Sequence, residues 1–247
     1  MTFRTLALSL ACMLTAAAAT ASVELAAGGA SRCTILAPAR LFIADQKTPP
    51  GAVGAAELEA NRRRLRASVL DLAHYLGTLS GASITVATNA SDVQGVAVRI
   101  GEEAAAVFGP VGLSVMGGQG YRVVVDKRGV GLFGEADLGT SYAIYDLLHR
   151  LGCRWYMPGE LGEVIPAVSD IRLDEQDRTG RPHTLYRGVW YADEAFKRRN
   201  RTGGVQLSAG HALEGYIGQD VREQHPDWRA VSGGKPAHRR LKWSKPG

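Results

Sequence analysis

The chain has 247 residues, 45% of them hydrophobic and 21% charged, which excludes disorder along its whole length and allows one full domain and part of a second. Its formal net charge of +5 depends on residues 233–247, which hold five basic and no acidic residues. When these five and Arg4 are subtracted from the 29 basic residues, 23 remain against 24 acidic ones, so we expect no nucleic-acid partner.

The first residues are typical of a cleaved secretory signal. Met1–Ala21 has one positive charge at Arg4, an apolar run from Leu6 to Leu14 and small residues at its end. We predict cleavage after Ala21 and a secreted or periplasmic protein. The apolar run is shorter than the ~20 residues of a spanning helix, so we expect no membrane span. Cys12 leaves a lipoprotein signal as the less favoured alternative.

The next stretch predicts short strands and one long helix. We expect Ser22–Ala30, which is rich in small residues, to be a flexible lead-in. Cys33–Leu36 and Leu41–Ile43 are predicted strands separated by a proline. From Glu57 to Leu79, apolar residues recur in steps of three and four, which indicates a helix with one buried face. The arginines at 62–64 and 66 lie largely off that face, so we expect them to be solvated.

Four further strands and a short helix are predicted next. Ile84–Val86 and Val96–Ile100 are β-prone runs, and a short helix is expected after Gly101. Tyr121–Val125 and Val130–Phe133 flank a four-residue turn that ends in glycine, which is the pattern of a β-hairpin.

We predict neither a cofactor nor a metal site. Gly117–Gly120 is glycine-rich but precedes a strand, whereas a phosphate-binding loop follows a strand and opens a helix, so we interpret it as a loop. Cys33 and Cys153 lack metal-ligand spacing, and the sequence leaves open whether they form a disulfide or stay as two buried thiols.

The stretch Gly134–Pro166 predicts a helix, a buried strand and an acidic loop. The apolar spacing of the helix is carried by Ile144, Leu147, Leu148 and Leu151. Thr140 is the expected N-terminal cap, and Gly152 is expected to end the helix in a left-handed conformation. Arg154–Tyr156 follows as a strand, and Glu160 and Glu163 are predicted to be loop surface.

Several of these runs also resemble a known domain. They are the strand Gly120–Val125, the helix start Gly139-Thr140, Tyr142–Tyr145 and Leu151–Tyr156. The chain resembles here the accessory domain that precedes the catalytic barrel in alpha-glucuronidases, beta-N-acetylhexosaminidases and a related bacterial family. The resemblance implies an α+β fold, a two-layer sandwich with helices on one face of a mixed sheet. The order of the predicted elements suggests the same architecture.

The domain organisation follows from the resemblance and from a polar stretch near Asp174–Pro182. We expect a signal peptide at 1–21, the accessory α+β domain at 22–178, and the first part of an incomplete (β/α) barrel at 179–247. A whole barrel needs ~250 residues, so the barrel is expected to be only begun.

The resemblance also implies a carbohydrate partner and candidate contacts to it. Arg187 matches an arginine that contacts sugar hydroxyls, and a guanidinium offers several donors in one plane. Trp190 is an aromatic surface for a sugar ring, while Asn200 and His211 are expected near the barrel mouth. The structural alternative makes Arg187 an interdomain ion-pair residue and Trp190 a core residue. We predict no catalytic residue, because the paired carboxylates of such enzymes come from later strands.

Two functional hypotheses follow. The first is the N-terminal part of a secreted glycoside-hydrolase-like protein acting on a polysaccharide or glycoconjugate, with the accessory domain supporting the barrel. The alternative is a non-catalytic carbohydrate-binding or cell-envelope module.

Overall fold

The computed structural model describes residues 22–205, 224–225, 231–232 and 235–236. The chain divides into two compact units, Met1–Val205 and Gln206–Gly247. In the second unit, β14 (Val231–Ser232) and β15 (Lys235–Pro236) pair antiparallel. Among the described residues, no helix is both long and apolar enough to cross a membrane.

The first unit is built on a six-stranded mixed sheet. Its strands, in spatial order, are β11 (Gln176–Gly180), β6 (Tyr121–Asp126), β7 (Gly129–Gly134), β5 (Val96–Ile100), β3 (Cys33–Leu36) and β4 (Thr85–Ala87). Neighbours from β7 to β4 are parallel, whereas β6 pairs antiparallel with both β7 and β11. The predicted mixed sheet is confirmed, including the β6–β7 hairpin. Gly129 is required at its turn, because a Cβ there would lie 2.5 Å from the Ala97 carbonyl oxygen.

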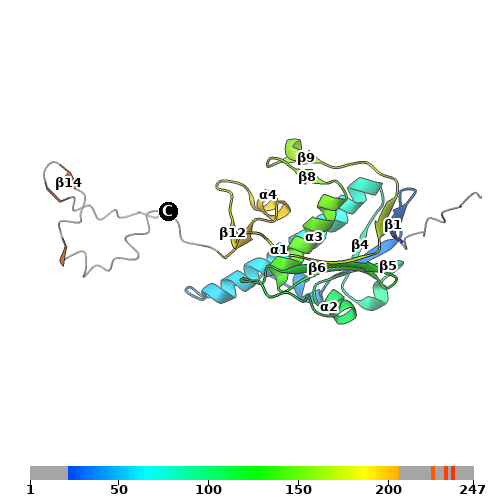
Figure 1. The fold of residues 1–247 in the computed structure, drawn as a ribbon, viewed down its shortest axis with the longest axis horizontal. Helices are drawn as coiled ribbons and strands as arrows, with labels where there is room; N and C mark the ends of the chain where they lie inside the picture. The colour runs from blue at the N-terminus through cyan, green and yellow to red at the C-terminus, as the bar shows by residue number, and fades with distance from the viewer. Residues whose placement is uncertain (1–21, 206–223, 226–230, 233–234, 237–247) are drawn as a thin grey trace, which may run out of the picture. The chain divides into compact units, whose positions relative to one another are not determined.

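Two long helices cover one face of this sheet. α1 (Val53–Ser80) and α3 (Asp137–Arg150) pack side by side, as Figure 1 shows. Their buried leucines meet Val123, Val130 and Leu132 of the hairpin in one continuous core. Burial of this apolar surface stabilises the unit by roughly 25 cal/mol per Å².

The opposite face is also partly covered, by the short helix α2 (Glu102–Phe108). Phe108 stacks on Phe133 with ring centroids 6.5 Å apart, and a Cβ on Gly131 would lie 2.6 Å from the Phe108 ring. Because side chains alternate along β7, Leu132 faces the long helices while Phe133 faces α2. The prediction of helices on one face therefore holds for the two long helices only.

The predicted flexible lead-in was wrong. β1 (Ser22–Ala27) pairs antiparallel with β10 (Ile171–Asp174) and with the short β2 (Ala30–Ser31). Leu25 and Ala26 are fully buried, so even this stretch of small residues contributes to the core.

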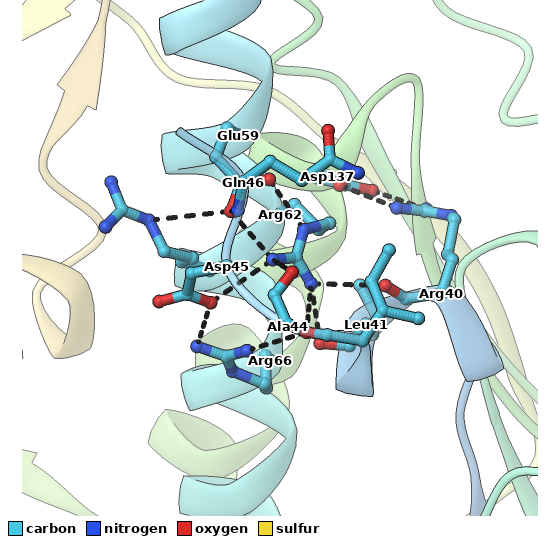
Figure 2. Close-up of polar contacts among 11 residues, drawn as sticks. Arg40, Leu41, Ala44, Asp45, Gln46, Glu59, Arg62, Arg66 and Asp137 are labelled. Atoms are coloured by element: carbon cyan, nitrogen blue, oxygen red, sulfur yellow. Dashed lines mark hydrogen bonds and ion pairs between the residues drawn. The ribbon is translucent and has the colours of Figure 1, made fainter. Parts of the chain in front are cut away.

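The expected strand at Leu41–Ile43 is instead a 3₁₀ turn, η1 (Ala39–Phe42). In Figure 2, Arg62 of α1 donates to the carbonyl oxygen of Leu41, a bond of 2.9 Å. Arg62 also donates to the carbonyl oxygen of Ile43 at 3.3 Å, so no neighbouring strand is needed to satisfy these two acceptors. Arg62 is only 7% exposed and pairs with Glu59 at 2.7 Å, so the prediction that it is solvated was wrong.

The start of α3 is set by close backbone packing and not by the expected Thr140 cap. The helix begins at Asp137, and the Thr140 hydroxyl is buried, accepting from the Gly134 amide at 2.9 Å and donating to the Ala136 carbonyl at 3.1 Å. A Cβ on Gly139 would lie 2.3 Å from the Gly120 carbonyl oxygen. The glycine-rich loop therefore makes close backbone contact with α3, and its interpretation as a loop is confirmed.

Three further features complete the first unit. β8 (Arg154–Trp155) and β9 (Glu163–Val164) form a small hairpin, with η3 (Glu160–Gly162) between them, and η2 (Ala90–Asp92) precedes β5. β12 (Tyr186–Arg187) and β13 (Gly203–Gly204) pair around α4 (Glu194–Arg199).

Two predictions about single residues can be compared with the structure. Cys33 and Cys153 are both buried free thiols, and Gly152 has the expected positive φ, of 95°.

Candidate functional site

Residues 184–205, called here the docking segment, lie on the α1 and α3 face and include all the described candidate site residues. In Figure 1, β12 and α4 of this segment lie beside the two long helices. The segment is attached mainly through the arginines 187, 198, 199 and 201.

Arg187 has a partner for each of its nitrogens. Nη1 and Nη2 both donate to Gln119 Oε1 at 3.1 Å, and Nη2 also donates to the Tyr142 hydroxyl at 2.8 Å. Nη1 and Nε donate to the carbonyls of Thr184 and Arg201, at 2.8 and 3.1 Å. Gln119 is fully buried. This guanidinium therefore joins the docking segment to the glycine-rich loop and α3, with neutral acceptors in place of an ion pair.

α4 is attached through two carboxylates. Asp71 of α1 pairs with Arg198 at 3.0 Å and with Arg199 at 3.2 Å, and it accepts from the Tyr145 hydroxyl at 2.6 Å. Burial alone would raise the pKa of Asp71, but Tyr145 and the two guanidiniums lower it below its ordinary value. Glu163 of β9 accepts from Arg199 at 2.5 Å and from the Tyr75 hydroxyl at 3.0 Å, so the prediction of loop surface was wrong for Glu163.

Asp146 of α3 is the third attachment point. It pairs with Arg178 of β11, with Arg150 at 3.2 Å and with Arg201 of the docking segment at 3.1 Å. Burial would raise the pKa of Asp146, but the surrounding arginines lower it. The carboxylate is thus held ionised between the sheet, the helix and the docking segment.

The other predicted contacts have different positions. Trp190 is 74% exposed and packs edge-on against Tyr191, which is 98% exposed. The Asn200 amide donates to the carbonyls of Trp155 and Phe196 at 3.2 and 3.1 Å, so it fixes the end of α4. His211 lies outside the described residues.

A pocket of about 410 Å³ lies between α1, the β8–β9 hairpin and α4. Its lining includes His74, Tyr75, Trp155, Glu160, Glu163, Asp193 and Arg199. Aromatic edges beside carboxylate acceptors suit a ligand that has both an apolar face and hydroxyl donors. The pocket depends on the docking segment, because α4 forms one of its walls. Within the described part of the chain, no group of three His, Cys, Asp or Glu side chains is arranged to hold a metal ion.

Sequence reasoning missed Asp71 and Asp146 altogether. Each had a local signal, since each is an acidic residue next to apolar residues of a predicted helix, in Leu70-Asp71-Leu72 and Tyr145-Asp146-Leu147. A charged residue in such a place needs a partner when the helix face is buried. The partners of Asp71 and Asp146 in the docking segment lie 55 to 128 residues away, so the sequence does not identify them.

Comparison with models of protein families finds no match. Comparison with curated proteins likewise finds no significant sequence similarity.

Proposed function

We propose that this chain belongs to a secreted glycoside-hydrolase-like protein acting on a polysaccharide or glycoconjugate, and that residues 22–178 are its non-catalytic accessory domain. Residues from 179 onward begin the part that carries the chemistry. The domain resemblance supports the proposed class of protein, and the contacts of the docking segment support a physical role for the domain. That role is to hold the start of the following region in a fixed position.

The attachment of the docking segment is the observation that carries this proposal. Arg187, Arg198 and Arg201 connect it to residues of α1, α3 and the glycine-rich loop. Charged pairs that are largely withdrawn from water are costly to break singly, so such a joint resists local opening. These partly buried contacts fix the docking segment on α1, α3 and the glycine-rich loop, as the proposed role requires.

Hydrolysis assays of the natural protein that contains residues 22–205 give the direct test. We expect it to release reducing ends from a polysaccharide or glycoconjugate. Binding of a glycan without hydrolysis would contradict the proposal and leave the binding module as the better account.

The second candidate, a carbohydrate-binding module, is favoured by one observation. Trp190 and Tyr191 are both strongly exposed, and Tyr191 has a positive φ of 60°, which is unusual for a non-glycine residue. Exposed aromatic rings provide stacking surfaces for sugars.

Affinity electrophoresis of the intact chain in gels containing neutral polysaccharides tests this second candidate. If it is correct, Trp190→Ala weakens retardation about tenfold, because one stacked ring is lost. The matched control is Tyr156→Ala, which removes an aromatic ring that is 71% exposed. No retardation by any polysaccharide, or equal loss in both variants, would count against a binding module centred on Trp190.

A further inference from the structure

A second pocket, of about 590 Å³, lies where the parallel strands β3, β5 and β7 begin, beside β1. Its charged lining consists of Arg32, Arg99, Lys127, Arg128, Glu24 and Asp126. Basic side chains reach it from the β2–β3 connection, from β5 and from the β6–β7 turn. This site is separate from the docking segment and from the candidate sugar contacts.

Both carboxylates of this pocket are already neutralised by arginines. Glu24 pairs with Arg172 at 3.0 Å, and Asp126 pairs with Arg128 at 2.6 Å. Three basic residues of the pocket, Arg32, Arg99 and Lys127, have no ion pair with any residue in the described part of the chain. Lys127 also acts electrostatically on Asp126. The four basic and two acidic residues that line the pocket carry a net charge of +2, although residues 22–232 as a whole are close to neutral.

Arg99 is held in place without its charge being cancelled. Its Nη1 donates to the Arg128 carbonyl at 2.8 Å, which leaves its other nitrogens without an acceptor among the described residues. Arg128 is itself fixed, since it donates to the Val107 carbonyl at 2.9 Å and lies over the Phe108 ring at 4.6 Å. A guanidinium positioned in this way loses little conformational freedom when it binds a ligand.

We propose that this pocket binds a phosphate or sulfate group. Three cations that approach from separate segments suit a tetrahedral oxyanion, whose oxygens point in several directions, better than a planar carboxylate. The uncompensated charge also favours a dianion over a monoanion. Arg99 provides the fixed guanidinium contact, while Arg32 and Lys127, which are exposed, close on the anion from the rim. The site is independent of the proposed glycan function, and either can fail without the other.

Calorimetric titration of the intact chain with inorganic phosphate, sulfate and acetate at constant ionic strength tests the site. We expect phosphate and sulfate to bind at least about tenfold more tightly than acetate. Arg99→Gln should weaken phosphate binding by about tenfold or more, and so should the double variant Arg32→Gln with Lys127→Gln. The double variant changes exposed side chains only, so it tests the site even if Arg99→Gln folds poorly.

The matched control is Lys47→Gln with Arg181→Gln, which removes two exposed basic side chains that do not line this pocket. Phosphate affinity within about twofold of the unmodified chain is expected for it. An added titration with a hexose phosphate shows which kind of ligand the pocket binds. Tighter binding than that of inorganic phosphate indicates a phosphate ester, and weaker binding indicates the free ion. Absence of phosphate and sulfate binding, equal binding of acetate, or equal loss in the control would overturn the proposal.

Discussion

Arg187 and Gln119, which are 68 residues apart in the chain, are joined by two hydrogen bonds of 3.1 Å from the guanidinium to one amide oxygen. Gln119 Nε2 in turn donates to the carbonyls of Met116 and Leu185, each at 3.0 Å. The glycine-rich loop and the docking segment therefore form one hydrogen-bonded joint, and Gln119 is completely buried within it.

The first prediction concerns this joint. Arg187→Met keeps the apolar stem but leaves Gln119 Oε1 and the Tyr142 hydroxyl without their main donor. We expect the free energy of unfolding to fall by about 2–4 kcal/mol, because buried acceptors lose charge-assisted bonds. Urea unfolding followed by tryptophan fluorescence measures it. Unchanged stability together with lost polysaccharide retardation would instead make Arg187 a ligand contact.

A second prediction tests the backbone contact at the start of α3. Gly139→Ala places a Cβ 2.3 Å from the Gly120 carbonyl oxygen, so we expect destabilisation of at least about 3 kcal/mol or failure to fold. Gly54→Ala is the matched control: it lies in the first turn of α1 with no atom within 4 Å of the new Cβ, and should stabilise the protein by up to ~1 kcal/mol. Thermal unfolding of both variants gives the comparison, and equal effects would contradict the packing argument.

The third prediction is a dependence of stability on pH in two separate ranges. Burial, reinforced by Arg201 and Arg154, lowers the pKa of His149 from 6.5 to about 4. Below pH 6.5 the unfolded chain binds a proton that the folded protein does not, so stability falls until the pH reaches about 4, by on the order of 1–3 kcal/mol. Asp71 and Asp146 have lowered pKa values, so their contribution is present above about pH 4 and is lost on further acidification.

Urea unfolding across this pH range, on the unmodified chain and on His149→Gln, separates the two ranges. The free energy of unfolding of the variant should not fall between about pH 6.5 and 4, but it should still fall at lower pH. Identical curves for the two proteins would mean that His149 titrates normally in the folded state.

A fourth prediction concerns the thiols. Burial raises the pKa of both Cys33 and Cys153 to about 11. Because the thiolate is the reactive species, neither should react with a disulfide reagent at neutral pH in the folded protein, and both should react after unfolding in urea. Rapid labelling of either residue under native conditions would contradict its buried position.

The regular part of the fold was predictable because its signals are local. Cys33–Leu36 and Val96–Ile100 are strands over the predicted residues, and the hairpin turn lies at its glycine. β1 was missed because its small residues have little strand propensity of their own, and their pairing with β10 depends on residues about 150 positions away. Tertiary pairing outweighs propensity in such a stretch.

The site was less predictable for the same reason. Arg187 was recognised as a residue with many donors, but the sequence does not show that Gln119 and Tyr142 would occupy them. The Asn200 amide likewise donates to two backbone carbonyls. Every residue has a backbone carbonyl, so no sequence motif indicates which ones Asn200 contacts. Trp190, in contrast, is exposed as a ligand contact requires, so its predicted role is the one that binding measurements test most simply.

Hydrogen exchange of the intact chain at neutral pH tests the central claim, that the docking segment is a fixed part of the first unit. The amides of Lys197, Thr202 and Val205 donate to the carbonyls of Asp193, Lys197 and Leu185 at 3.0–3.1 Å. We expect these amides to exchange at least about a hundredfold more slowly than in an unfolded chain, and Arg187→Met to accelerate them. Exchange at unfolded rates in residues 184–205, with α1 and α3 still protected, would contradict the claim that the docking segment is a fixed part of the first unit.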